Sequence, residues 1–410
     1  MKKSILVFCM LLQLVCVSVY AQTGIFVPEL SVVDGQISEF MQKWNLPGGS
    51  VALVKEGRLL YARGFGEADK STRVQPHHLF RIASLSKPIT AMAIMKLIQE
   101  GMLQADALVF GEKGILNTPA YQHIADERVK RITVRHLLEH TAGWDREINP
   151  LGDPMFNSVI IAKEMQVATP ANQLAIIQYV LSKPLDFDPG TKFSYSNIGY
   201  CIVGRIIEQV TGLPYGEYVY QHLLQPLGIA DIQLAKNLYE AKHEKEVRYH
   251  DVSSRGLMPS VYDPSDKVSY PYGGFNLEAM DSHGGWIASA TDLAKLLVAA
   301  DGFSTKPDFL QAATINAMIT PCKQYPGYAM GWFVNSSGNW WHTGSLAGSS
   351  AIMVRLQEGY SWVVLFNGNP QTHAYFAALD QLMITALRKV QIWPTHDLFN
   401  PAAVTQRDTQ

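Results

Sequence analysis

The hydrophobic pattern near the N-terminus predicts a helix, two strands and a second helix. Over residues 34–44 apolar side chains recur at the three- and four-residue spacing of a helix, and Asp34 stands where a capping residue would begin it. Residues 50–55 and 59–65 are apolar and bounded by turn residues, which is typical of buried strands. A strongly apolar stretch over residues 84–100 predicts the second helix.

Patterns of the same kinds return near the C-terminus. Strands are predicted over residues 328–334, 339–343, 350–356 and 361–367, with turn residues between them. An apolar helical pattern over residues 373–390 follows the last strand. Both ends of the chain therefore carry strands, and each end also carries a helix.

The segment between these ends, residues 105–275, is rich in helical pattern and long loops. Three helices are predicted there, over residues 133–140, 171–181 and 198–211. Residues 240–275 form a polar, irregular excursion. This order of elements predicts an α+β fold: an antiparallel β-sheet flanked by the N- and C-terminal helices, with an inserted helical region. We expect residues 22–104 and 276–410 to form the sheet domain and residues 105–275 to form the insertion.

Composition allows a large hydrophobic core and argues against a nucleic-acid partner. The chain has 410 residues, of which 47% are hydrophobic, and its formal net charge is −2 with no long basic run. Nucleic acids and anionic membrane surfaces attract strongly basic patches, which this chain lacks. Neither is therefore expected as a partner.

Residues 1–21 have the pattern of a signal peptide for export. Lys2 and Lys3 precede an apolar stretch over residues 5–19, and Ala21 stands at a position typical of cleavage. A membrane anchor is the alternative, but the stretch is short for a spanning helix and no later segment resembles one. We expect a periplasmic or secreted protein with no stable membrane span after the signal is removed.

Two cysteines lie beyond this segment. In an oxidising compartment Cys201 and Cys322 could pair, but two cysteines far apart in sequence do not establish a disulfide. We favour two free, buried thiols.

A hydroxyl and an amine stand three residues apart where the helix over residues 84–100 begins. In Ser84-Leu-Ser-Lys87 both side chains project from one face, because a helical turn takes 3.6 residues. A desolvated lysine can take the proton of a serine and so activate it as a nucleophile. An isolated pair of this kind is often only a helix cap beside a surface lysine, so its meaning depends on the rest of the chain.

Three further short stretches carry candidate chemistry. Tyr195-Ser196-Asn197 lies in a polar turn just before a predicted helix, and His342-Thr343-Gly344-Ser345 ends a predicted strand. Gly284-Gly285-Trp286 precedes a capped helix. Each of them alone is compatible with ordinary turn or strand-end chemistry.

Taken in order, Ser84-x-x-Lys87, Tyr195-x-Asn197 and His342-Thr343-Gly344 resemble the motifs of the penicillin-recognising serine hydrolases, with histidine replacing the lysine that opens the third motif. That superfamily includes class C β-lactamases, serine D-Ala-D-Ala carboxypeptidases, D-aminopeptidases, family VIII esterases and some acyltransferases. The resemblance covers nearly the whole mature chain. It implies a β-lactamase/transpeptidase-like fold and a small-molecule or short peptide substrate, with no cofactor.

The resemblance also implies a role for each motif residue. Ser84 would attack a carbonyl and form an acyl-enzyme, Lys87 and Tyr195 would share proton transfer, and Asn197 would orient Lys87 and the substrate. The backbone N–H groups of Ser84 and Ser345 would form the oxyanion hole. An ammonium on Lys87 would favour tyrosinate, so we expect a Tyr195 pKa below its usual value of about 10.

His342 departs from the family pattern in an informative way. A lysine there would be cationic at neutral pH and would bind a substrate carboxylate, whereas histidine, with a reference pKa of about 6.5, is mostly neutral. This favours a peptidase, an aminopeptidase or an esterase over an efficient β-lactamase.

Five tryptophans lie in or beside the motifs: Trp144, Trp286, Trp332, Trp340 and Trp341. If these side chains face the cleft, the substrate pocket is bulky and apolar. We take Trp144 and Trp286 as candidate substrate contacts. Such a pocket would also admit an alcohol acceptor in place of water. The alternative is that most of them pack the core.

His136-Leu-Leu-Glu-His140 matches the H-x-x-E-H pattern of one class of zinc peptidases. On a helix the two histidines would share a face, as a zinc ion requires. The sequence offers no convincing third ligand, and the leucines between them indicate an amphipathic helix. We therefore favour a structural role and expect no metal.

Three functions remain open from the sequence. The first is an exported serine hydrolase that acts on an amide or ester through an acyl-enzyme on Ser84. The second is an acyltransferase that passes the acyl group to an alcohol of a hydrophobic small molecule. The third is a non-catalytic penicillin-binding sensor, against which the intact polar motifs argue. The sequence does not identify the substrate.

Overall fold

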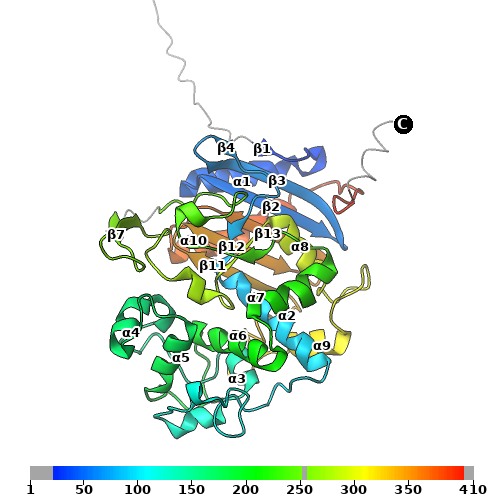
Figure 1. Ribbon diagram of the computed structural model, residues 1–410. Coiled ribbons are helices and arrows are strands. Elements are labelled where there is room, and N and C mark those ends of the chain that lie inside the picture. The colour runs from blue at the N-terminus through cyan, green and yellow to red at the C-terminus, as the bar shows by residue number, and fades with distance from the viewer. Residues whose placement is uncertain (1–21, 252–255, 401–410) are drawn as a thin grey trace, which may run out of the picture.

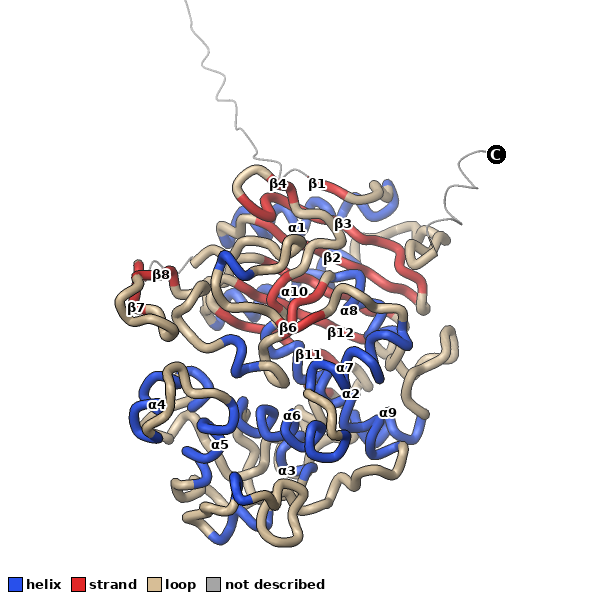
Figure 2. The backbone as a smooth tube through the Cα atoms, in the orientation of Figure 1, coloured by secondary structure: helices blue, strands red, loops and turns tan. Residues whose placement is uncertain are grey.

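The computed structural model describes residues 22–251 and 256–400, and the predicted export signal over residues 1–21 lies outside them (Figure 1). Strands gather in the upper half of the view and most helices in the lower half (Figure 2). No helix in the described ranges is both long enough and apolar enough to cross a membrane.

The main sheet has eight strands in the order β1-β3-β2-β13-β12-β11-β10, with β4 paired to β3. Its strands are β1 (Gln22–Thr23), β2 (Gly48–Lys55), β3 (Arg58–Asp69), β4 (Thr72–Arg73), β10 (Phe333–Val334), β11 (Trp340–Leu346), β12 (Ser349–Arg355) and β13 (Tyr360–Phe366). Every pairing is antiparallel, and the central pairing of β2 with β13 places Val51 opposite Val364. The sheet is therefore built from both ends of the chain, as predicted.

Both faces of this sheet are covered, which explains the continuous apolar runs of its central strands. The helices α1 (Ser31–Trp44) and α10 (His373–Leu387) pack together on one face. On the other face α8 (Ala290–Val298) contacts β2 and β13. Helices at both ends and an antiparallel sheet confirm the predicted α+β class.

The remaining helices lie below the sheet in the view of Figure 1. They are α2 (Ser86–Gln99), α3 (Val134–Leu138), α4 (Ser158–Met165), α5 (Gln173–Leu181), α6 (Asn197–Thr211), α7 (Tyr215–Val219) and α9 (Ala312–Ile319). The strongly apolar α2 packs against α6, α7 and α9, so it is buried almost all round. Because α2 also follows directly from the segment that carries Ser84, its burial fixes that segment between the sheet and the helices.

Two small sheets complete the fold. One joins β5 (Phe80–Arg81), β9 (Trp286–Ala288) and β6 (Gln233–Leu234), and the other is the hairpin of β7 (Leu257–Pro259) and β8 (Lys267–Ser269) within the polar excursion. Because β6 comes from the middle of the chain and pairs with β9, the proposed insertion over residues 105–275 is tied to the sheet part rather than set apart from it.

Three predictions of detail have clear outcomes. The first helix begins at Ser31, so Asp34 is not its cap; its carboxylate is buried and accepts a hydrogen bond from the Tyr61 hydroxyl. The strand predicted over residues 328–334 shortens to β10. The preference for two free, buried thiols is confirmed for Cys201 and Cys322.

Candidate active site

Ser84 lies in a short 3₁₀ turn, η2 (Ala83–Leu85), between β5 and α2. Ala83 has a φ of 50°, a left-handed conformation that is costly for a residue with a side chain. The strand β11 packs against this turn, and a Cβ on Gly344 would lie 2.2 Å from the carbonyl oxygen of Ile82. Glycine at position 344 therefore lets the strand approach the nucleophile closely.

Lys87 is fully buried in the first turn of α2 and has three polar neighbours. Its Nζ lies 3.0 Å from Ser84 Oγ, 2.7 Å from Asn197 Oδ1 and 3.0 Å from the carbonyl oxygen of His283. Burial lowers the pKa of the amine well below its usual value, and the positive charge of Arg146 lowers it further, while Asp153 opposes this shift. A neutral amine can donate to Asn197 and His283 and still offer its lone pair to the Ser84 hydroxyl.

Tyr195 stands beside this pair, but its pKa moves in the direction opposite to our expectation. Lys87 Nζ lies 4.8 Å from the centroid of the phenol ring. Burial raises the Tyr195 pKa, and a hydrogen bond with Ser84 offsets this only in part. The predicted lowering is therefore wrong, because the argument ignored desolvation of both groups. These shifts favour a neutral Tyr195 that could donate a proton and a Lys87 amine that could accept one.

Asn197 begins α6 directly after its N-cap, Ser196, whose hydroxyl accepts the N–H of Gly199. The Asn197 amide oxygen accepts the hydrogen bond from Lys87, and its amide nitrogen donates to Asp153 Oδ2 at 2.6 Å. Sequence reasoning missed Asp153. The Asp153-Pro154 dipeptide signals only a local turn, so no pattern along the chain points to a contact with a residue 44 positions away.

His342 lies on β11 and is 1% exposed. Its Nδ1 is 2.7 Å from the carbonyl oxygen of Thr343, and its Nε2 is 3.3 Å from the hydroxyl of Tyr328. Burial and the neighbouring Lys87 lower its pKa to about 3, so the imidazole is neutral, as the sequence suggested. It does not hydrogen-bond to Ser84, Lys87 or Tyr195, although its ring centroid lies 6.2 Å from that of Tyr195.

The free edge of β11 faces the same region. Its neighbour β10 pairs only with Trp340 and Trp341, so in the described structure the rest of β11 is paired with β12 on one side and with no strand on the other. Ser345 is exposed on this edge, and its hydroxyl accepts a hydrogen bond from the Asn369 amide at 2.9 Å. The oxyanion-hole role expected of its backbone N–H stays a prediction.

A cavity of about 420 Å³ adjoins Tyr195 and Asn197 on the helical side of the site. Trp144, Leu151 and Val180 contribute apolar walls, and Arg146 and Asp153 also line it, whereas Ser84 does not. Trp144 is therefore placed where a substrate group could contact it.

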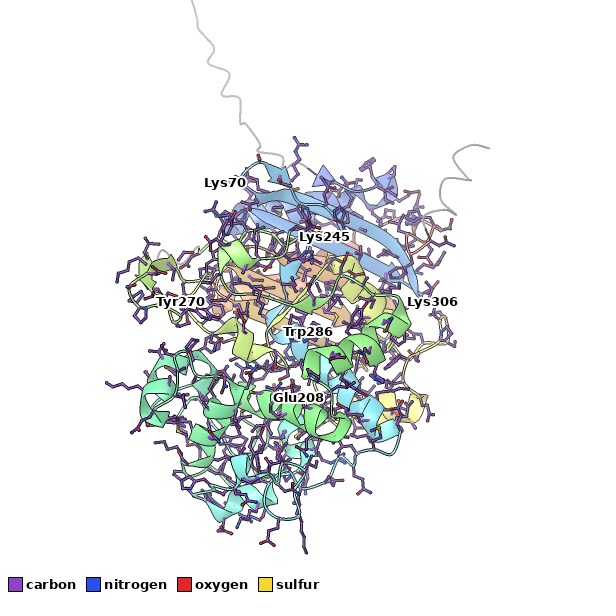
Figure 3. The ribbon with its side chains drawn as sticks, viewed as in Figure 1. Lys70, Glu208, Lys245, Tyr270, Trp286 and Lys306 are labelled. Atoms are coloured by element: carbon purple, nitrogen blue, oxygen red, sulfur yellow. The ribbon has the colours of Figure 1, made fainter. Side chains whose placement is uncertain are left out.

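Trp286 is placed differently from our expectation. It is 1% exposed, lies on β9, and donates its indole N–H to the Tyr215 hydroxyl at 3.0 Å. Figure 3 labels it near the middle of the molecule, between the sheet and the helices below. The structure does not place Trp286 on the cavity, because its side chain fills the core between these layers.

The two histidines of the H-x-x-E-H pattern do not share a helix face. The helix α3 ends at Leu138, and His140 follows with a φ of 58°. His136 Nδ1 accepts the N–H of Thr133, and His140 Nδ1 accepts the N–H of Ser196. His140 thus supports the turn that carries Tyr195. Within the part of the chain that is described, no group of three or more His, Cys, Asp or Glu residues could hold a metal ion.

Comparison with known proteins places most of the chain in one family. A family model described as Beta-lactamase matches residues 33–386. Among curated proteins, Protein flp of Staphylococcus aureus (strain MW2) is 27% identical over 347 residues, which cover 83% of this chain and 63% of that protein. The chain thus spans less than two thirds of the length of this relative. A putative D-alanyl-D-alanine carboxypeptidase of Escherichia coli O157:H7 is 24% identical over 336 residues, covering 77% and 74%.

Two solved structures show the same fold. The D-amino acid amidase of Ochrobactrum anthropi SV3, complexed with L-phenylalanine, has a TM-score of 0.66 at 24% identity, covering 87% of this chain and 98% of that one. EstCE1, described as a hydrolase with promiscuous acyltransferase activity, has a TM-score of 0.67 at 21% identity, covering 88% and 98%.

The state of Lys87 predicts how acylation depends on pH. Because a protonated amine cannot take the Ser84 proton, labelling of Ser84 by an activated ester should rise with pH through an apparent pKa well below 10.5, the usual lysine value. Lys87→Arg, which stays protonated, should lose at least about 10³-fold in labelling rate. His342→Gln is the control, because a histidine with a pKa of about 3 is already neutral over this range. A rise that disappears in His342→Gln would contradict the assignment to Lys87.

The placement of the two tryptophans predicts opposite phenotypes. Trp286→Phe should lower the free energy of unfolding by about 1–3 kcal/mol, because it removes a buried hydrogen bond and leaves the Tyr215 hydroxyl with Thr90 as its remaining partner. It should leave KM within about twofold. Trp144→Ala, which opens the cavity wall, should instead change KM. Denaturant unfolding and steady-state kinetics on the same preparations measure both effects, and a raised KM with unchanged stability in Trp286→Phe would restore it as a substrate contact.

Proposed function

Because the chain belongs to the Beta-lactamase family, we propose that it is an exported serine hydrolase that forms an acyl-enzyme at Ser84 on an amide or ester. The family match also confirms the predicted membership of the penicillin-recognising serine hydrolases. The observation that carries the proposal is the contact of Ser84 Oγ with the buried Lys87 Nζ at 3.0 Å. Export rests on the residue pattern over residues 1–21 alone.

The proposed mechanism of acylation starts from a neutral Lys87 amine and a protonated Tyr195 hydroxyl. Neutral Lys87 takes the proton of Ser84 while Oγ attacks the substrate carbonyl. The backbone N–H groups of Ser84 and Ser345 stabilise the resulting oxyanion. Tyr195, kept neutral by its burial, donates its proton to the departing nitrogen or oxygen and regains one from the Lys87 ammonium. Water then attacks the acyl-enzyme, and the proton transfers run in reverse.

The kind of substrate is narrowed by charge and by space. His342 is neutral, so the strand beside the nucleophile supplies no fixed cation for a carboxylate, which argues against an enzyme tuned for β-lactams. The cavity beside Tyr195 and Asn197 has room for a bulky, largely apolar group. The activities printed for similar proteins, a putative D-alanyl-D-alanine carboxypeptidase, a D-amino acid amidase and a hydrolase with promiscuous acyltransferase activity, support an amide or ester substrate.

Acyl transfer is the second candidate, and the apolar wall at Trp144 is the observation that favours it. A hydrophobic alcohol bound there would be positioned to attack the acyl-enzyme in place of water. A purely penicillin-binding sensor is less well supported, because the base, the nucleophile and the proton donor are all in contact.

Removal of the nucleophile tests the hydrolase directly. Ser84→Ala should abolish covalent labelling and reduce turnover by at least about 10³-fold, because the acyl bond forms on the hydroxyl that this variant lacks. Intact-mass spectrometry across a panel of D-amino acid amides, short peptides, lipophilic esters and β-lactams would detect the acyl-enzyme and rank the substrates. Ser265→Ala, at an exposed serine outside the site, is the matched control and should label normally. Labelling that persists in Ser84→Ala would disprove the proposal.

Product analysis separates hydrolysis from transfer. With a lipophilic ester as donor and a hydrophobic alcohol added to saturation, an acyltransferase should release mainly the new ester, whereas a hydrolase should release mainly the free acid. Trp144→Ala should shift the product ratio toward the acid, because it removes apolar contact area for the acceptor. A ratio that responds neither to the alcohol nor to this substitution would exclude acyl transfer.

A further inference from the structure

The Asn197 side chain is held from both ends. Its oxygen faces the amine of Lys87 at 2.7 Å, and its nitrogen faces the carboxylate of Asp153 at 2.6 Å. An amide can be rotated by half a turn with almost no change in shape, so its hydrogen-bond partners decide which way it points. A carboxylate only accepts hydrogen bonds, so it can face only the nitrogen end.

Asp153 is placed to hold this orientation firmly. Its Oδ1 accepts the N–H of Met155 at 3.0 Å and so caps the short helix η5 (Pro154–Phe156), while its Oδ2 takes the Asn197 contact. The two oxygens thus have separate tasks. Burial raises the Asp153 pKa, but the hydrogen bonds to Met155 and Asn197 and the charges of Arg146 and Lys87 oppose this.

We propose that Asp153 is a positioning residue for the acylation step: its carboxylate fixes the Asn197 amide so that the oxygen faces Lys87, which keeps the amine in line with Ser84. The inference rests on the proposed function. If the amide were turned round, its nitrogen would point at the Lys87 amine, and two donors would face each other. Lys87 would then lose one of the acceptors that hold its Nζ beside Ser84 Oγ.

The charge of Asp153 also acts on the Lys87 pKa, so the pH dependence of acylation is a second measurement that tests the proposal. Two charged side chains, Asp153 and Arg146, act on the Lys87 pKa. The rings of Tyr195 and Tyr200 also lie near the amine. Three buried histidines complete its surroundings: His140, His283 and His342. The pKa values of these histidines are lowered, so all three are neutral. Of the two charged groups, Asp153 raises the Lys87 pKa and Arg146 lowers it. The acid limb of the pH–rate profile is the range in which the acylation rate rises as Lys87 loses its proton. Loss of the Asp153 charge should therefore move this acid limb to lower pH, and Arg146→Gln should move it to higher pH.

Asp153→Asn is the sharpest test, because an asparagine cannot perform both tasks. If its oxygen keeps the cap on Met155, its nitrogen faces the Asn197 nitrogen and forces that amide to turn. We expect kcat for acylation to fall by about 10- to 100-fold with little change in KM, and the acid limb to move to lower pH. Asp145→Asn is the matched control: Asp145 lies in the same loop and is also buried, but its carboxylate binds Lys192, Ser194 and the backbone N–H of Glu147. It should leave the limb in place.

The double variant Asp153→Asn/Asn197→Asp exchanges the two groups. The new carboxylate at position 197 can accept from Lys87 and from the nitrogen of the new amide at position 153, while the oxygen of that amide keeps the cap. We expect the double variant to recover most of the lost rate at high pH, with its acid limb moved upward by the carboxylate next to the amine. A purely structural role for Asp153 predicts no such recovery.

A crystal structure of Asp153→Asn reads the Asn197 orientation, through its hydrogen-bond partners, independently of any substrate. An unturned amide together with an unchanged kcat and acid limb would overturn the inference. Asp145→Asn shifting the limb equally would also overturn it. Failure of the proposed function is distinct, because the wild-type protein itself would then form no acyl-enzyme.

Discussion

The chemistry proposed for this protein depends on one buried amine. Lys87 has no exposed surface, and its Nζ is surrounded by a hydroxyl, an amide oxygen and a backbone carbonyl. Removing an ammonium from water is costly, so burial shifts the amine toward its neutral form, in which it can take a proton. The same burial keeps Tyr195 protonated. In the proposed mechanism desolvation therefore decides which group is the base and which is the acid.

The fold supplies this burial through the layers around α2. The main sheet closes one side, α6 and α7 close the other, and β11 approaches the turn of Ser84 because Gly344 has no side chain. Close packing of this kind keeps water away from Lys87 on both of these sides. The left-handed Ala83 is held in place by the same packing, which over-determines the position of the nucleophile.

The layered fold and the motifs that mark the family could be predicted from the sequence because each has a local signature. Alternating and helical patterns mark the strands and helices, and Ser84-x-x-Lys87, Tyr195-x-Asn197 and His342-Thr343-Gly344 mark the site. Asp34 was misassigned as a cap because its real partner, Tyr61, is on another element. Asp153 was missed for the same reason, because its partner Asn197 is far away in sequence. Trp286 was taken as a substrate contact because it lies near a motif in sequence, but this does not reveal which layer of the fold its side chain fills. The Tyr195 pKa could not be predicted, since desolvation is a property of the assembled site.

The histidine at position 342 fits this electrostatic arrangement. A lysine at position 342 would be a second cation near Lys87, in addition to Arg146, and it would lower the pKa of the Lys87 amine further. The new lysine would also have to be desolvated. A neutral imidazole that is bound to the Thr343 carbonyl and to Tyr328 occupies the position without that cost. It also leaves Arg146, which lines the cavity together with Asp153, as the charged group that opposes Asp153 at Lys87. Burial is the main cause of the lowered Lys87 pKa, and the balance between these two side chains, both from the loop after α3, adjusts it further.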